Sequence, residues 1–213
     1  MSKDIADKIV YVVRHGQTEG NILNAVQGSD DMLSVDGRMQ AERIAMRAKD
    51  LDFEAILSSD YIRAVDTAKA IQKATGKDIT LSEHLREVAH PTSLRGVVRS
   101  DERFTSYHIE QLAHITEHAW RHSDEENFFD LRARARKAED EILSHPARAV
   151  LVVSHANFIK CLTGQIMFGS DFTPQIFRHM RASIYISNTG ISLFKYQSGK
   201  WCVVTLNDHA HLG

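Results

Sequence analysis

The sequence predicts an α/β fold, a three-layer α/β/α sandwich whose sheet is mostly parallel. Short runs rich in β-branched residues alternate with amphipathic helical stretches, which is typical of parallel strands joined by crossover helices. The first run, KIVYVV at 8–13, ends abruptly in Arg14, His15 and Gly16. A buried strand ends in this way at the ligand-binding edge of such a sheet. A polar stretch at about 88–130 separates the two halves and predicts a helical cap insertion.

Individual elements follow from hydrophobic periodicity and from capping residues. Runs with the composition of strands lie at residues 8–13, 54–58, 149–154, 182–187, 190–196 and 201–206. Helices are expected between the early runs, each after a residue suited to an N-cap, at 37–49, 61–75 and 156–167. The last three runs have no helical stretch between them, so that edge is expected to be antiparallel, with NTG at 188–190 as a tight turn.

Bulk composition limits the classes of function. A chain of 213 residues suits one domain, residues 1–213, that carries the cap as an insertion. The net charge of −2 gives no basic footprint for nucleic acid or an anionic membrane. The charged start, MSKDIADK, precedes an apolar run too short for a signal peptide or a membrane span. Two cysteines, Cys161 and Cys202, fit a reducing cytoplasm, and both are expected to be buried thiols.

Reactive side chains gather at three strand-to-helix junctions. The first carries Arg14 and His15, and the second, SSDYIRAVDTA at 58–68, carries Arg63 just inside a helix. The third, VVSHANF, carries His155 at the start of another helix. Because the carboxyl ends of parallel strands meet at one edge, these residues are expected to form a compact cationic nest. Arginine forks match phosphate oxygens and helix N-termini favour anions, so a phosphoryl group is the expected ligand.

Five motifs stand in a fixed order along the chain: RHGQTEGN, LSVDGRMQA at 33–41, SSDYIRAVDTA at 58–68, LREV at 85–88 and VVSHANFI at 152–159. Together they closely resemble the histidine phosphatase superfamily, in its phosphoglycerate-mutase-like branch. The resemblance runs from about residue 8 to the C-terminal LNDHAHL. It implies a site at the carboxyl edge of the sheet and a phosphomonoesterase acting on a phosphorylated small molecule or phosphoprotein.

The resemblance also assigns roles to particular residues. The nucleophilic histidine falls on His15, the phosphate-clamping arginines on Arg14 and Arg63, the second histidine on His155 and the acid on Glu87. The expected chemistry is attack of neutral His15 on phosphorus, which gives a phosphohistidine without a metal or other cofactor. Glu87 would protonate the leaving oxygen and then activate water. The competing interpretation of Glu87 is a surface carboxylate.

Substrate contacts implied by the resemblance fall on Asn21 and on backbone near Gln27 and Gly28. After the second histidine the family usually has glycine, and here Ala156 takes that place. Alanine keeps the backbone N–H as a donor, so little loss is expected. The two arginines of the nest would also bind the substrate.

Three other functions compete with a phosphatase. A cofactor-dependent phosphoglycerate-type mutase would return the phosphoryl group to its substrate. The segment HAN, with Asn157 as its last residue, resembles the sequence of such mutases. However, LREVAHPTSLRG lacks their basic pattern, and the chain ends soon after its last strand.

HITEH, from His114 to His118, matches a zinc-peptidase pattern and with His122 would place three imidazoles at helical spacing. The preferred interpretation of that segment is a histidine-rich solvated helix, because the pattern is short and a zinc site needs a further ligand from elsewhere. A non-catalytic phosphate-binding protein is disfavoured, because this sequence retains every central site position of the family that it resembles.

The sequence leaves the substrate and the oligomeric state open. Three arginines of the expected cap, Arg95, Arg99 and Arg103, would either hold a second anionic group of the substrate or remain solvated charges. A small phosphate ester is the expected binding partner, with no nucleic acid and no membrane.

Overall fold

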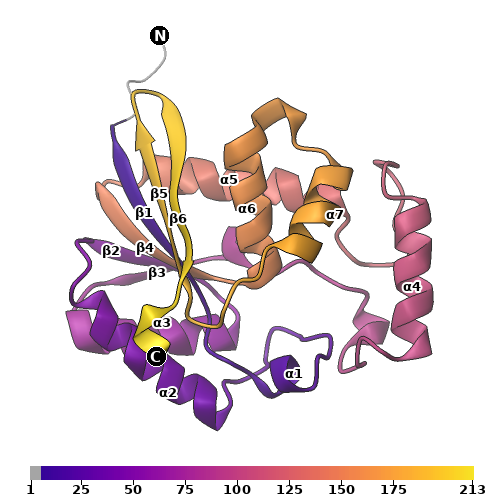
Figure 1. Ribbon diagram of the computed structural model, residues 1–213, viewed down its shortest axis with the longest axis horizontal. Coiled ribbons are helices and arrows are strands. Elements are labelled where there is room, and N and C mark those ends of the chain that lie inside the picture. Colours follow the sequence, from indigo (N-terminus) through magenta and orange to yellow (C-terminus); the bar gives the residue numbers. More distant parts are fainter. Residues whose placement is uncertain (1–5) are drawn as a thin grey trace.

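The computed structural model describes residues 6–213 as a six-stranded sheet between two layers of helices (Figure 1). The strands are β1 (Lys8–Arg14), β2 (Ala55–Ser59), β3 (Ile79–Ser82), β4 (Ala149–Ser154), β5 (Ile191–Gln197) and β6 (Lys200–Asp208). The helices are α1 (Glu19–Ile22), α2 (Val35–Ala48), α3 (Ile62–Thr75), α4 (Glu102–Ala113), α5 (Phe128–Ser144), α6 (Ala156–Phe168) and α7 (Pro174–Ser183). Short 3₁₀ turns are η1 (Glu83–Leu85), η2 (Thr92–Leu94), η3 (Gly169–Asp171) and η4 (Ala210–Leu212). The expectation that the start of the chain is neither a signal peptide nor a membrane span rests partly on residues 1–5, which lie outside the described residues.

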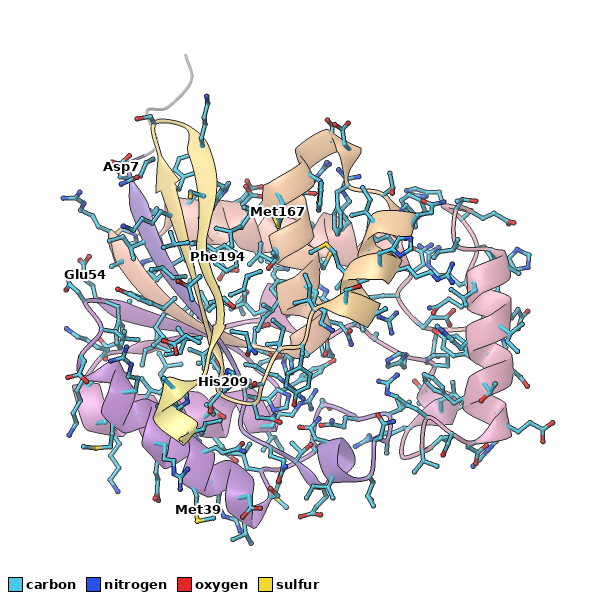
Figure 2. The ribbon with its side chains drawn as sticks, in the orientation of Figure 1. Asp7, Met39, Glu54, Met167, Phe194 and His209 are labelled. Carbon is cyan, nitrogen blue, oxygen red and sulfur yellow. The ribbon has the colours of Figure 1, made fainter. Side chains whose placement is uncertain are left out.

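The strand order is β3-β2-β4-β1-β5-β6, with β1 to β4 parallel and the last two strands antiparallel. The register pairs Arg14 with Ser154 and Ser58 with Val153, so β1, β2 and β4 end at one edge. The predicted fold class, a mostly parallel sheet with an antiparallel edge, is therefore confirmed. Asp7 and Glu54 mark the opposite, amino ends of β1 and β2, away from α1 and α4 (Figure 2).

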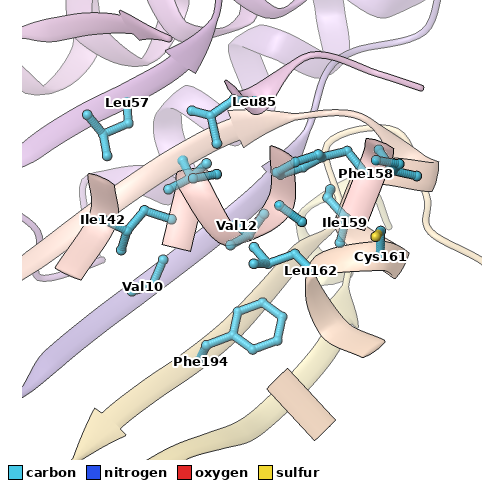
Figure 3. Packing of buried hydrophobic residues seen from close by; sticks show 14 of the residues in the cluster. Val10, Val12, Leu57, Leu85, Ile142, Phe158, Ile159, Cys161, Leu162 and Phe194 are labelled. Carbon is cyan, nitrogen blue, oxygen red and sulfur yellow. The ribbon is translucent and has the colours of Figure 1, made fainter. Parts of the chain in front are cut away.

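Two apolar cores hold the layers together. Strand side chains alternate between faces, so Val12 and Val13 point to opposite sides of the sheet. Val12 packs with Leu162 of α6 and Phe194 of β5 (Figure 3). Val13 packs with Ile44 of α2 in the other core. As a result α5 and α6 cover one face and α2 and α3 cover the other (Figure 1). Every residue of β4 is buried, as expected for a strand covered on both faces.

The strand predicted at 182–187 is wrong, because its first residues end helix α7. The helix begins where the Thr173 side chain accepts the N–H of Ile176, with Pro174 in the first turn. The alternating apolar residues after it belong to no strand. The tight turn at 188–190 is present: the N–H of Gly190 donates to Ser187 O at 3.0 Å, and the chain then enters β5.

The histidine-rich segment does not form the helix that the sequence suggests. Helix α4 ends at Ala113, with His114 as its C-cap residue. The helical spacing expected for His114, His118 and His122 is therefore wrong. In the part of the chain from residue 6 onward, no group of three or more His, Cys, Asp or Glu side chains is arranged to hold a metal ion.

The expectations for membranes and cysteines are also addressed by the structure. None of the helices among the described residues has the length and apolar character needed to span a bilayer. Cys161 is buried, as expected. Cys202 lies exposed, so its expected burial is wrong, because it belongs to the edge strand β6.

Candidate active site

His15 directly follows β1, where the sheet fixes its backbone. Its N–H donates to Ser154 O at 2.9 Å, and its ring Nδ1–H donates to Gly16 O at 2.6 Å. A carbonyl can only accept, so the proton of the neutral ring is on Nδ1 and the lone pair is on Nε2. Burial, and then the charges of Arg63 and Arg14, hold the pKa of His15 well below its usual value. The ring is therefore neutral at physiological pH, with its Nε2 lone pair free of a proton.

Arg63 lies in the first turn of α3 and is only 1% exposed. Its Nε donates to His15 Nε2 at 3.3 Å, and its Nη1 donates to Gly28 O at 2.6 Å. The guanidinium carbon is 5.1 Å from the centre of the Tyr61 ring. Burial lowers the pKa of Arg63, which forms no ion pair with a carboxylate of residues 6–213. A buried cation of this kind is stabilised by an incoming anion.

Arg14 and His155 complete the cationic group. Arg14 donates from Nη1 to Ile186 O at 2.7 Å, and its buried Nε has no partner within the described chain. His155 has 0% exposure, and its Nε2 is 2.8 Å from Ser59 Oγ. Its ring centre is 5.0 Å from that of His15. Burial, followed by the charge of Arg63, lowers its pKa well below the usual value. His155 is not among the residues that line the cavity, and its ring packs beside that of His15 in the interior.

Glu87 reaches the same edge from the loop after η1. Its Oε2 accepts the N–H of Asn157 at 3.2 Å, and its Oε1 accepts those of Phe158 and Val88 at 3.0 Å each. Asn157 and Phe158 belong to the first turn of α6, whose N–H groups have no partners within the helix. The helix therefore fixes the carboxylate on the wall of the cavity that His15 also lines.

Asn21 is tied to the loop that carries His15. Its Oδ1 accepts the N–H of Thr18 at 3.2 Å and the Nδ2–H of Asn188 at 3.1 Å. Asn188 also donates to His15 O at 3.0 Å. The side-chain oxygen of Asn21 is thus engaged within the protein. Its NH₂ group is left as the donor on the cavity wall.

The three remaining predicted substrate residues differ in position. Gln27 and Ala156 line the cavity. Gly28 does not, because its N–H donates to Asp31 at 2.6 Å and its carbonyl accepts from Arg63. The backbone of Gly28 is thus held between Asp31 and Arg63, and its carbonyl fixes the orientation of the Arg63 guanidinium.

One cavity of about 720 Å³ is lined by seven of these residues, namely Arg14, His15, Asn21, Gln27, Arg63, Glu87 and Ala156. Of the three cap arginines, Arg99 lines it, whereas Arg95 pairs with Asp30 and Arg103 pairs with Asp101 on the surface. Sequence reasoning missed further lining residues, namely His90, Lys160, Arg178, Arg181, Tyr185 and Asn188. The NTG motif at 188–190 was the one available signal, and it indicated only a turn.

Comparisons with known proteins identify the family of the chain. The family model described as histidine phosphatase superfamily (branch 1) matches residues 10–209. A probable phosphoglycerate mutase GpmB of Escherichia fergusonii is 32% identical, with 95% of this chain and 94% of the relative covered. The solved structure of Bacillus stearothermophilus YhfR is similar with a TM-score of 0.83 at 25% identity, covering 97% of this chain and 100% of that one.

A second similar solved structure is a phosphoserine phosphatase mutant from Entamoeba histolytica, bound to phosphoserine. It has a TM-score of 0.77 at 24% identity and covers 97% of this chain and 100% of that one. At this identity the likeness concerns the fold. The match of the family model to nearly the whole chain carries the assignment, which the ordered motifs had predicted. The chain belongs to branch 1 of the histidine phosphatase superfamily.

Proposed function

We propose that the protein is a phosphomonoesterase that forms a phosphohistidine on Nε2 of His15 and then hydrolyses it. The observation that carries this proposal is the state of the His15 ring. Gly16 O holds the proton on Nδ1, and the unprotonated Nε2 faces a cation, Arg63, at 3.3 Å. A neutral imidazole nitrogen beside buried arginines suits attack on an electron-rich phosphate ester.

In the first step the Nε2 lone pair forms a bond to phosphorus while the bond from phosphorus to the ester oxygen breaks. Glu87 gives a proton to that leaving oxygen, which departs as an alcohol. Arg14 and Arg63 neutralise the charge that spreads over the three equatorial oxygens. The N–H of Ala156, at the start of α6, is a further donor to these oxygens, because those of Asn157 and Phe158 are engaged by Glu87.

In the second step the Glu87 carboxylate accepts a proton from a water molecule as that water attacks phosphorus. The bond from phosphorus to Nε2 breaks, and His15 returns to its neutral form with inorganic phosphate released. The protein's own cations supply the positive charge in both steps. Independence from metal ions is therefore part of the proposal.

A mutase is the second candidate, because relatives at 31–32% identity are named probable phosphoglycerate mutases. Both reactions share the phosphohistidine and differ in whether water or an alcohol accepts the phosphoryl group. Hydrolysis is favoured because the cavity wall includes exposed side chains. Tyr185 is 74% exposed and Arg178 is also exposed, so water reaches the cavity.

The test uses the purified full chain with p-nitrophenyl phosphate in the presence of a chelator. Phosphate release is expected to continue, and vanadate is expected to inhibit as a mimic of five-coordinate phosphorus. Acid quenching with labelled substrate should give an acid-labile, alkali-stable adduct that is absent from His15→Ala. An adduct that persists in this variant contradicts the assignment. Loss of activity with chelator and its recovery with zinc contradicts metal independence, and isomerisation of phosphoglycerate faster than phosphate release favours the mutase.

The proposal includes a cytoplasmic location. Both cysteines are free thiols, and Cys202 is exposed. An exposed unpaired thiol suits a reducing compartment better than an oxidising one. Fractionation of cells that produce the protein at its natural level would test this, with recovery outside the cytoplasmic fraction as the contrary result.

A further inference from the structure

A second group of cations lines the cavity that holds His15. It consists of Arg99, Lys160 and Arg181, which we call the distal cations. Arg99 lies in the segment before α4, Lys160 in α6 and Arg181 in α7, so three separate parts of the chain contribute (Figure 1). None of the three belongs to the set that clamps the phosphoryl group in the proposed reaction.

The distal cations differ from the surface arginines of the cap in their ion pairing. None of them forms an ion pair with a carboxylate within residues 6–213. Lys160 Nζ donates to the backbone oxygen of Arg181 at 3.0 Å, and Arg99 Nη2 is 3.3 Å from His90 Nε2. In contrast, Arg103 on the outer surface pairs with Asp101 at 2.8 Å. The cap thus pairs this surface arginine and leaves the cavity arginine unpaired.

This arrangement is electrostatically unfavourable without a ligand. Burial, and then the charge of Arg181, lower the pKa values of both Arg99 and Lys160. Burial also lowers the pKa of Arg181. Aromatic rings orient both guanidinium groups, with Arg99 4.8 Å from the Phe104 ring centre and Arg181 5.9 Å from that of Phe177. Like charges held together in a partly desolvated space are stabilised by a bound anion.

A phosphoryl group bound at His15 does not by itself neutralise the positive charge of the distal cations. Arg14 and Arg63 face His15, whereas Arg181 is the cation that most strongly affects Arg99 and Lys160. Lys160 joins the two groups, because Arg14 also lowers its pKa. The carboxylate of Glu87 acts on all three distal cations, but it is engaged by N–H groups of α6.

We propose that Arg99, Lys160 and Arg181 bind a second acidic group of the substrate. The natural substrate is then a phosphate monoester that also carries a carboxylate or a second phosphate. Arginine forks match both kinds of oxyanion, and an ester with a neutral end would leave three desolvated cations unpaired. This inference rests on the proposed function, since it names the class of substrate for the same cavity.

The test compares kcat/KM within two matched pairs of esters. The carboxylate pair is 3-phosphoglycerate and glycerol 3-phosphate, which differ only at the end remote from the phosphate. The phosphate pair is butane-1,4-diol bisphosphate and its monophosphate. In one pair we expect kcat/KM for the acidic member to be higher by about tenfold or more. Hydrogen bonds to charged groups contribute a free energy of this size. The pair that shows the preference identifies the second group.

Two variants test whether the distal cations cause the preference. Arg99→Met and Arg181→Met keep an apolar stem against the aromatic rings, and each should reduce the preference by about tenfold. Arg103→Met is the matched control from the same segment and should keep the wild-type preference. Calorimetric titration of the same esters into His15→Ala protein, and into that protein with each Met substitution added, measures the preference without turnover. Wild-type protein without a preference in either pair, or a preference that survives in both Met variants, overturns the inference. Absence of phosphate release and of phosphohistidine with every ester instead contradicts the proposed function.

Discussion

Arg63 Nε lies 3.3 Å from Nε2 of His15, so the expected nucleophilic atom already has a cation directed at it. The same guanidinium donates to Gly28 O, which fixes its plane. A lysine has no planar fork and cannot keep both contacts.

Arg63→Lys is therefore expected to slow phosphohistidine formation by about 10²–10³-fold, as when one preorganised donor is removed from a charge-stabilising site. Rapid-quench measurement with labelled p-nitrophenyl phosphate checks this. Arg38→Lys is the control, because Arg38 also donates to a backbone oxygen, that of Leu33 at 2.8 Å, but lies outside the cavity. Equal rates in Arg63→Lys and wild type would remove Arg63 from the proposed chemistry.

Glu87→Gln separates acid catalysis from mere proximity. Glutamine keeps the shape and one acceptor oxygen for the N–H groups of α6 but carries no transferable proton. A general acid contributes about 10²–10⁴-fold where the leaving group needs a proton. The variant should thus be slowed far more with an alkyl phosphate than with p-nitrophenyl phosphate. With the latter, a burst should appear because the second step lacks its base. Equal slowing of both substrates without a burst would assign the acid to another carboxylate.

Arg134 holds the loop that carries Glu87. Its guanidinium donates to Arg86 O at 2.7 Å and Glu87 O at 3.1 Å, and pairs with Glu126 at 2.7 Å. Arg134→Lys should therefore displace Glu87, the proposed acid, and lower kcat for alkyl phosphates by about tenfold. Turnover of p-nitrophenyl phosphate should change less, because its leaving group needs no proton. Arg132→Lys is the control on the same helix, since Arg132 contacts Gln165 and the end of α6. A loss that is uniform across leaving groups would indicate a purely structural role.

His90 makes stability depend on pH. Burial, and then Arg99, Arg181 and His108, lower its pKa from 6.5 to about 3. Below pH 6.5 the unfolded chain binds a proton that the native state does not bind, so stability falls as the pH falls from 6.5 toward 3. The slope for one such group is about 1.4 kcal/mol per pH unit. His90→Phe should reduce the pH slope of the unfolding free energy by this amount, measured by urea denaturation between pH 6 and 4. Identical slopes in the two proteins would contradict a buried neutral His90.

Sequence reasoning locates the site where chemistry coincides with strand ends. Arg14, His15 and His155 each fall at the end of an apolar run, and parallel pairing brings those ends together. Asn188 could not be found this way, because its bond to His15 O joins residues 173 positions apart. Local periodicity carries no information about such a contact.

Arg181 was hidden by a wrong prediction of secondary structure. The alternation in ASIYIS suggested a strand at 182–187, although Thr173 and Pro174 supply a cap and first turn for α7. Lys160 lies in an otherwise apolar helix, where a charge is easily interpreted as solvated. These residues reach the cavity only through the packing of α6 and α7, which depends on tertiary contacts.

The position of β1 has a consequence for biosynthesis. Strand β1, which leads directly into His15, leaves the ribosome before its two neighbours, β4 and β5, which are formed by residues 149–154 and 191–197. Until those residues emerge, the nascent chain has an apolar strand with both edges open. Pairings between such distant segments form slowly and leave strands exposed to aggregation. His15 is thus synthesised well before the strands that fix its position, so fragments that stop before β5 are expected to be inactive and prone to aggregate.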